Sequence, residues 1–230
     1  MCGRYALTTD LEALLPRLRG PLPPDFARHY APRPLIRPGE PVLIQCRDDG
    51  RDRVALALWG LLPAWVKQPV GAPRPINARS ETVAERPSFR GAWRHRRCLI
   101  PADAFFEKGC RISRRDGATF WLGGLWERWL GPDGSELESC CVLTTAANAL
   151  IAPWHPRMPV LIPDTAASAW LAAADGAALR RLVPLLGPWA PEGWHLEPAS
   201  RSKAPPPEGP RQRNAPGPAS LDRRQLILPL

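Results

Sequence analysis

The hairpin pattern in residues 41–59 constrains the fold of this chain more than any other sequence feature. Two apolar runs, Pro41–Cys46 and Arg53–Trp59, flank the turn sequence Asp48-Asp49-Gly50 and predict an antiparallel pair of strands. Further strand-like runs cover residues 97–100, 104–107, 119–128, 139–144 and 158–162. Because strands and helices do not alternate regularly, we expect an α+β domain with a twisted, barrel-like, mostly antiparallel sheet and not a doubly wound fold.

Short helices are expected to flank this sheet. Thr9 and Asp10 precede leucines at helical spacing, which predicts a capped helix that ends at Gly20. Other helices are expected over residues 80–85, 89–94, 148–151, 164–174 and 177–186. From residue 200 onward the sequence is dense in proline, arginine and serine. We therefore predict one domain over residues 1–199 and a flexible basic tail over residues 200–230.

The charge of the chain favours a polyanionic partner. It has 31 lysine and arginine residues against 22 aspartate and glutamate residues, a formal net charge of +9, and nucleic acid is the first candidate for such a protein. No apolar run has the length of a signal peptide or a membrane span. We expect a cytoplasmic, nucleoid-associated monomer that binds no membrane.

Six cysteines are present, but none has the paired spacing of a zinc site. We expect them to be reduced, and we expect no metal and no other cofactor. Four of them, Cys46, Cys98, Cys140 and Cys141, lie in apolar runs and are interpreted as core residues.

Cys2 differs from the other cysteines because it follows the initiator methionine. Removal of Met1 would leave an amine and a thiol on the same residue. An α-amine has a pKa of about 8, so part of it is neutral near pH 7 and can attack an aldehyde to form an imine. A thiolate, which we expect a nearby arginine to favour, would then close a five-membered thiazolidine. The sequence thus predicts covalent capture of an aldehyde.

Three further segments carry polar residues suited to such chemistry. Asn77 and Arg79 lie where a loop is expected to enter a helix, a place suited to orienting a nucleophile and holding phosphate. Glu107 ends a very apolar strand, where partial burial would let its carboxyl relay protons, although a simple ion pair is the alternative. His155 and Arg157 lie in a proline-stiffened loop, and histidine is the usual proton shuttle near neutral pH.

Five motifs, in this order, resemble those of the SOS-response-associated peptidase (SRAP) family. They are MCGRYAL, WGLLPAW, INARSET, RCLIPADAFFE and TTAANALIAPWHPRMPVLI, spread from residue 2 to about residue 163. The resemblance implies crosslinking of the protein to abasic sites in single-stranded DNA. It also implies that Cys2 is the nucleophile, that Asn77 orients its amine and thiol, that Glu107 assists ring opening and proton transfer, and that His155 acts as acid or base on the opened sugar.

The same resemblance implies a set of DNA contacts. Arg4, Arg79 and Arg157 match phosphate-contacting arginines of the family, and guanidinium groups grip phosphate oxygens without reading sequence. Trp59 and Trp65 match a segment near the DNA, where an exposed indole would stack on a base with about 1–3 kcal/mol.

Two other functions remain open from the sequence. Cys2, Asn77 and His155 also resemble the trio of a thiol protease, including one that removes its own Met1. A plain single-strand binding module is the third interpretation.

The end of the chain carries a separate motif. Its last six residues resemble the peptides with which bacterial repair proteins bind the replicative sliding clamp, with Gln225, Leu226, Leu228 and Leu230 as the partner-binding residues. A terminal strand that packs on the domain is the alternative.

Overall fold

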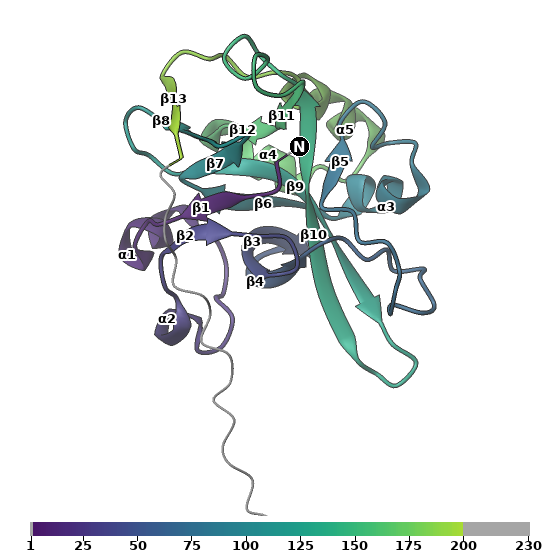
Figure 1. Cartoon of the computed structure of the whole chain (residues 1–230). Helices are drawn as coiled ribbons and strands as arrows, with labels where there is room; N and C mark the ends of the chain where they lie inside the picture. The colour runs from purple at the N-terminus through teal and green to yellow at the C-terminus, as the bar shows by residue number, and fades with distance from the viewer. Residues whose placement is uncertain (1, 200–230) are drawn as a thin grey trace, which may run out of the picture. The chain divides into compact units, whose positions relative to one another are not determined.

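The computed structural model describes residues 2–199 of the chain. Residue 1 and residues 200–230, which include the expected tail and its terminal motif, lie outside the described residues. Two sheets and several short helices make up the described part, as Figure 1 shows. The expected α+β fold with a barrel-like sheet is confirmed.

The larger sheet closes on itself. Its ring consists of β3 (Pro41–Asp48), β4 (Arg51–Trp59), β6 (Arg97–Ala102), β9 (Phe120–Leu130) and β10 (Glu136–Ala146). The order is β10-β4-β3-β6-β9, and β9 pairs back with β10. All pairs in the ring are antiparallel except β4 with β10. The ring encloses much of the apolar core, including Cys46, Cys98 and Cys140, whereas Cys141 belongs to a second apolar cluster. All four of these expected core cysteines are buried.

The predicted hairpin is present as β3 and β4. Asp48 pairs with Arg51, so the connection is the two-residue turn Asp49-Gly50. Both turn residues have a positive φ, 46° and 75°. Turns of this kind match the right-handed twist of the strands they join, which explains why a short local sequence specifies the pairing.

Three short strands extend the ring at one end. β5 (Asn77–Arg79) and β11 (Arg157–Pro159) pair with β10, and β12 (Leu161–Ile162) pairs with β9. The single strand expected over residues 158–162 is therefore two. Val160 separates them because its N–H donates to Leu143 at 2.8 Å, on one neighbour, and its carbonyl accepts from Gly123 at 2.9 Å, on the other.

The second sheet has five strands in the order β13-β8-β7-β1-β2. They are β1 (Tyr5–Leu7), β2 (Arg33–Ile36), β7 (Ala104–Glu107), β8 (Cys110–Arg114) and β13 (Trp194–Pro198). Only β7 was expected from the sequence. Because β1 lies between β7 and β2, the beginning of the chain is held inside a sheet and not at its edge.

The helices are short, and the predictions of two of them were wrong. The helices are α1 (Leu11–Leu14), which continues into η1 (Leu15–Arg17), α2 (Phe26–His29), α3 (Pro87–His95), α4 (Asp164–Ala172), α5 (Gly176–Leu182) and η2 (Val183–Leu186). Residues 80–85 and 148–151 form turns instead. In the first segment, Thr82 donates to Arg79 and Glu85 donates to Thr82, a succession of tight turns that ends where Pro87 starts α3.

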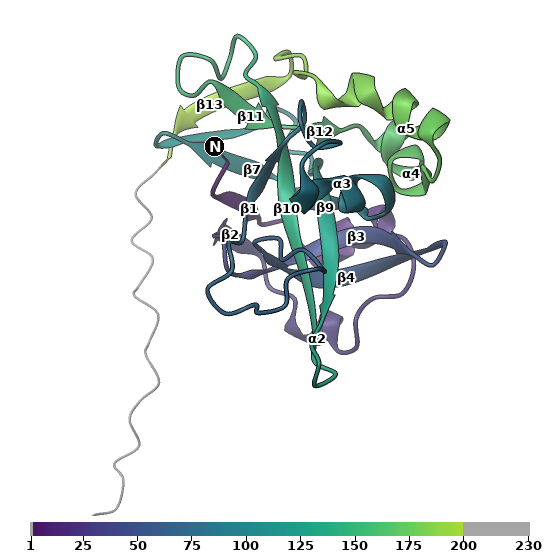
Figure 2. The ribbon, with the colours of Figure 1, turned by 90° about the vertical axis from the view of Figure 1, so that its right-hand side faces the viewer.

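Arg97 fastens two helices to the closed sheet. Its buried guanidinium donates to the carbonyls of Trp93 in α3, of Trp170 in α4 at 2.8 Å, and of Ala173 just after α4. Burial lowers the pKa of Arg97 to about 10. These carbonyls lie at helix C-termini, where a cation is favoured by the helix dipole. Figure 2 shows α3 in front of the β9–β10 pair, with α4 and α5 beside it. No helix within residues 2–199 is long and apolar enough to cross a membrane.

Candidate active site

The pairing of β1 with β7 positions Cys2. The Phe106 N–H donates to the Arg4 carbonyl at 3.0 Å, and the Asp103 N–H donates to the Ala6 carbonyl at 2.9 Å. Tyr5 lies opposite Phe105 in this pair of strands, and the two hydrogen bonds fix the β1 backbone before and after Tyr5. Cys2 itself is buried, with only 1% of its surface exposed. Its position is thus determined by a sheet and not by a loose terminus.

Asn77 contacts Cys2 from the other sheet. It lies on β5 opposite Val142 of β10, and its side-chain Nδ2 donates to the Cys2 carbonyl at 3.0 Å. Its Oδ1 is buried and has no hydrogen-bond partner within residues 2–199. A buried amide oxygen without a donor is costly. Asn77 therefore offers an acceptor beside the backbone of Cys2, which is suited to an amine there.

The Cys2 thiol is protonated near neutral pH. Burial, and then the negative charge of Glu107, raise its pKa to about 12. The sulfur approaches the Arg4 carbonyl oxygen at 3.8 Å. The expectation that a nearby arginine favours the thiolate is therefore wrong, because Arg4 presents its backbone to the sulfur and desolvation dominates. The thiol needs a base that removes its proton.

Glu107 lies close enough to Cys2 to act on it electrostatically. It is the last residue of β7 and is 8% exposed. The turn that follows, Lys108-Gly109, has positive φ at both residues, 49° and 81°, and returns the chain into β8 with Cys110 opposite Glu107. This tight hairpin keeps the carboxylate at the end of the strand and on the side of Cys2.

His155 lies just before β11 and Arg157 is the first residue of that strand. A hydrogen bond connects the two residues. The Arg157 N–H donates to His155 Nδ1 at 3.0 Å, which orients the ring. The Arg157 guanidinium forms a two-pronged ion pair with Glu81, at 2.5 and 2.8 Å, and donates to the Thr144 carbonyl at 2.5 Å. This contact lowers the pKa of Glu81. The arginine expected to bind phosphate is thus engaged by a carboxylate in this structure.

The end of β10 collects several of the expected site residues. Asn77 pairs with Val142 and Arg79 with Thr144 on one side of β10, and Arg157 pairs with Ala146 on the other. Two of the expected phosphate-binding residues, Arg4 and Arg79, are exposed. Within residues 2–199 neither has an ion-pair partner. The guanidinium of Arg4 is therefore available to an anion, and so is that of Arg79, whose charge also acts on Glu81.

The two expected stacking tryptophans differ in their surroundings. Trp59 is 1% exposed, donates from Nε1 to the Ile76 carbonyl at 2.9 Å, and packs edge-on against Tyr5 with ring centroids 5.4 Å apart. The expectation that it stacks on DNA is wrong, since both its ring and its N–H are used inside the core. Trp65 is 64% exposed. Trp154, at 43% exposed, was not singled out from the sequence, although its place directly before His155 was a usable signal.

Within the described part of the chain, no cluster of three or more histidine, cysteine, aspartate or glutamate residues has the arrangement of a metal site.

Known proteins resemble this chain over most of its length. Residues 1–202 match the family model described as SOS response associated peptidase (SRAP). The abasic site processing protein YoqW of Bacillus subtilis is 34% identical over 181 residues, which cover 74% of this chain and 80% of that protein. The abasic site processing protein YedK of Escherichia coli is 30% identical over 187 residues, covering 74% of this chain and 79% of that protein.

Solved structures show the same fold. A protein from Bacteroides thetaiotaomicron superimposes with a TM-score of 0.74 at 24% identity, covering 85% of this chain and 90% of that one. A protein from Bordetella bronchiseptica gives a TM-score of 0.68 at 25% identity, covering 85% of this chain and 98% of that one.

Proposed function

Because this chain belongs to the SOS response associated peptidase (SRAP) family, we propose that it captures abasic sites in single-stranded DNA through Cys2. Two relatives, YoqW and YedK, match this chain over 80% and 79% of their own length, and both are named abasic site processing proteins. The single observation that carries the proposal is the position of Cys2. Asn77 donates a hydrogen bond to its carbonyl, and the negative charge of Glu107 acts on its thiol. An abasic site exposes an aldehyde when its sugar ring opens, and the aldehyde is the group that an aminothiol traps.

The reaction balances with the loss of one water molecule. Hydrolytic removal of Met1 gives Cys2 a free α-amine, which attacks the C1′ aldehyde carbon to form a carbinolamine. The carbinolamine loses water and becomes an imine. The sulfur then adds to the imine carbon, the thiol proton passes to the nitrogen, and a thiazolidine ring results. In the thiazolidine, the nitrogen and the sulfur of Cys2 are both bonded to the former aldehyde carbon. The adduct is therefore far more stable than an imine alone.

Three side chains assist these steps. Asn77 Oδ1 accepts a hydrogen bond from the α-amine and aims its lone pair at the aldehyde. Glu107 takes the proton of the Cys2 thiol, whose raised pKa makes a base necessary, and returns it to nitrogen. His155, oriented by the Arg157 N–H, donates a proton to the sugar oxygen as the ring opens. Arg4 and Arg79 bind phosphates of the strand, and Trp65 stacks on a base.

The test uses protein whose amino terminus has been shown by mass spectrometry to begin at Cys2. It should form an adduct with abasic single-stranded DNA that survives a denaturing gel without borohydride. Cys2→Ala should form none. Cys2→Ser keeps the amine and should give only a labile imine or strand cleavage. Absence of a stable adduct with the trimmed wild-type protein would refute the proposal.

A cysteine peptidase is the second candidate, favoured by the family's description and by the contact between Asn77 and Cys2. A peptidase needs the thiol itself to make the first attack, whereas in aldehyde capture the amine attacks first. Because a thiol with a pKa of about 12 is a weak nucleophile without a strong base, we rank this candidate lower. Chain that retains Met1 discriminates the two activities, since it has no free amine at Cys2. If that form cleaves peptides or its own Met1 in purified solution, peptidase chemistry is established.

We also propose that the terminal motif, with Gln225, Leu226, Leu228 and Leu230, binds the replicative sliding clamp and thereby brings the protein to DNA in the nucleoid. The proposal rests on the sequence motif alone. Full-length protein should be retained on immobilised clamp, and a chain that ends before Asp222 should not. Equal retention of the two would contradict it.

A further inference from the structure

A closed loop carries His155 between β10 and β11. Residues 147–156 make up this His155 loop, and the Ala147 N–H closes it by donating to the Pro156 carbonyl at 3.0 Å. Inside the loop, the His155 N–H donates to the Ile151 carbonyl at 3.0 Å. Ile151 is buried in the apolar core. The backbone of His155 is therefore positioned by Ile151.

Asn148 fixes the turn that holds Ile151. Its side-chain Oδ1 accepts from the Ile151 N–H at 3.1 Å, and its Nδ2 donates to the carbonyl of Trp189 at 3.0 Å. Trp189 lies between η2 and β13, 41 positions later in the chain. A single amide thus connects the inside of the His155 loop to a segment that is distant in the sequence.

Trp189 also bonds to the chain that follows the His155 loop. Its indole Nε1 donates to the Pro159 carbonyl at 3.2 Å. Pro159 is the last residue of β11, the strand that Arg157 begins. The carbonyl of Trp189 is thus bonded to the chain before His155, and its indole is bonded to the chain after His155.

The ring of Trp189 contacts the strand that carries Glu107. It packs edge-on against Phe105 of β7, with ring centroids 6.4 Å apart, which is within the range of favourable aromatic pairs. Phe105 and Glu107 lie on the same face of β7, because alternate residues of a strand point to the same side. Trp189 therefore connects the loop of His155 with the strand of Glu107.

We propose that Asn148 and Trp189 are positioning residues, which hold the ring of His155 in place for proton transfer to the sugar. Both act through His155 and not on the substrate. The His155 loop needs such support because two of its residues, Pro153 and Pro156, have no N–H with which to bond to the rest of the fold. The support matters because a displacement of about 1 Å in a reacting group can cost about 10²-fold in rate.

This inference rests on the proposed function, since it concerns the residue that helps to open the sugar, and two substrates isolate that step. The first is single-stranded DNA with a natural abasic site, whose sugar is mostly a closed ring. The second carries an acyclic abasic analogue that lacks the 4′-oxygen and therefore always presents its aldehyde. Capture of the analogue needs no ring opening and no proton from His155. A residue that acts through His155 should therefore affect the first substrate only.

Two substitutions weaken the support of the His155 loop in different ways. Asn148→Ala removes both hydrogen bonds of the amide, and Trp189→Phe removes the Nε1 donor but keeps a ring against Phe105. Each should slow crosslinking to the natural site by about tenfold and leave the rate with the analogue unchanged. In a His155→Ala background, neither should slow the reaction further. Equal losses with the two substrates, or a further loss in the His155→Ala background, would overturn the proposal.

Trp194→Phe is the matched control for Trp189→Phe. The ring of Trp194 packs on that of Trp189 with centroids 4.4 Å apart and on that of Phe120 at 4.8 Å, so both substitutions exchange an indole for a smaller ring in one aromatic cluster. The hydrogen bonds to the His155 loop and to Pro159 come from Trp189. Trp194→Phe should therefore crosslink the natural site at the wild-type rate, and thermal melting checks that each variant is folded. Equal slowing by the two substitutions would contradict the proposal.

The ring nitrogens of His155 give a measurement that does not need the reaction. The chain has four histidines, so the ¹⁵N signals of this ring can be assigned by comparison with His155→Ala. In Asn148→Ala and Trp189→Phe these signals should shift, because movement of the loop changes the hydrogen bond from the Arg157 N–H to Nδ1. Unchanged signals would overturn the proposal. Failure of the wild type to crosslink abasic DNA would refute the proposed function, and the ring signals would still test the positioning.

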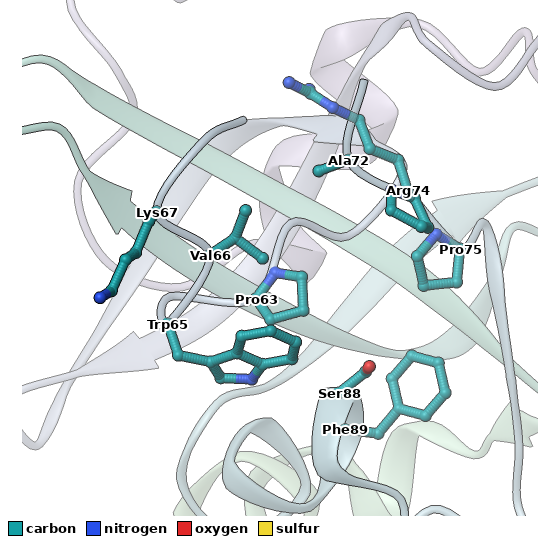
Figure 3. A pocket seen from close by; sticks show the side chains of 10 residues that line it. Pro63, Trp65, Val66, Lys67, Ala72, Arg74, Pro75, Ser88 and Phe89 are labelled. Atoms are coloured by element: carbon teal, nitrogen blue, oxygen red, sulfur yellow. The ribbon is translucent and has the colours of Figure 1, made fainter. Parts of the chain in front are cut away.

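Trp65→Leu separates positioning from DNA binding. Trp65, which we expect to stack on a base, lines a hollow of about 880 Å³ together with Phe89 and two prolines (Figure 3). Trp65→Leu should weaken noncovalent binding of DNA that carries a tetrahydrofuran abasic analogue, which has no aldehyde, and should leave the His155 signals as in the wild type. Asn148→Ala and Trp189→Phe should show the opposite pattern. If they weaken this binding as much as Trp65→Leu does, they shape the DNA surface and the proposal is wrong.

Discussion

The side-chain amide of Asn77 donates to the Cys2 carbonyl at 3.0 Å, while its oxygen is buried without a partner within residues 2–199. In the proposed reaction this oxygen accepts a hydrogen bond from the α-amine of Cys2. Asn77→Ala should therefore lower the crosslinking rate by about 10–100-fold, the effect expected when one orienting hydrogen bond and its geometry are lost. Noncovalent affinity for intact single-stranded DNA should stay the same. Equal losses in rate and in affinity would show that Asn77 shapes the DNA surface instead.

Glu107 should affect the Cys2 thiol and the crosslinking rate in opposite directions. Its charge helps to raise the pKa of Cys2 to about 12, so Glu107→Gln should lower that pKa and make the thiol ionise at lower pH. Crosslinking should nevertheless slow by about 10²-fold or more, since the group that moves the proton is lost. The pH dependence of iodoacetamide modification measures the thiol, and gel-stable adduct measures the reaction. A variant that crosslinks faster would show that Glu107 acts only as a charge.

The buried thiols should make the fold sensitive to alkali. Burial raises the pKa of Cys46 and of Cys141 from 9.0 to about 12. The folded chain therefore keeps these protons while the unfolded chain releases them. Their contribution to stability is complete below pH 9 and is lost as the pH rises toward 12. The free energy of unfolding should fall by about 1.4 kcal/mol per pH unit for each such thiol.

Urea denaturation at several pH values checks this dependence. Cys141→Ala should make the decline with pH shallower. Val142→Ala, on the same strand, should lower stability by the same amount at every pH. Parallel declines in the wild type and in Cys141→Ala would contradict the assignment.

Local signals in the sequence were sufficient for some elements and not for others. The β3–β4 hairpin was predictable because Asp49-Gly50 specifies its turn and because an apolar run lies on each side of that turn. β1 and β13 escaped prediction because they are short, and β13 owes its pairing to β8, about eighty positions earlier in the chain. Such strands are defined by their partners more than by their own composition.

The candidate site shows the same division. Cys2, Asn77 and Glu107 were identified by residue type and motif, and the fold places them around one another. The opposite environments of Trp59 and Trp65 were not predictable, because they depend on tertiary contacts such as the one between Trp59 and the Ile76 carbonyl. A motif can indicate which residues matter, but burial decides what each can touch.

Arg97 should be important for stability and not for the reaction. Its guanidinium supplies donors to three carbonyls from two helices. Lysine keeps the charge but lacks the planar fork that reaches all three. Arg97→Lys should therefore lower the free energy of unfolding by about 2–4 kcal/mol, measured by urea denaturation. Arg94→Lys, at an exposed position in the last turn of α3, should change it by less than about 0.5 kcal/mol. If the two variants are equally stable, the carbonyls find other donors.

The ion pair between Glu81 and Arg157 should limit how strongly Arg157 binds DNA. Because Glu81 holds both terminal nitrogens, Glu81→Gln should free the guanidinium for phosphate. The affinity for intact single-stranded DNA should rise by about 3–10-fold, and the salt dependence should steepen by about 0.7, as for one added phosphate contact. Arg157→Gln should cancel the gain in the Glu81→Gln background and have little effect in the wild type, a coupling that a double-mutant cycle measures. Glu85→Gln removes the same charge nearby without releasing Arg157, so its gain should be smaller. Weaker binding by Glu81→Gln would mean that the pair serves to hold β11 and His155 in place, and that Arg157 is a positioning residue and not a phosphate ligand.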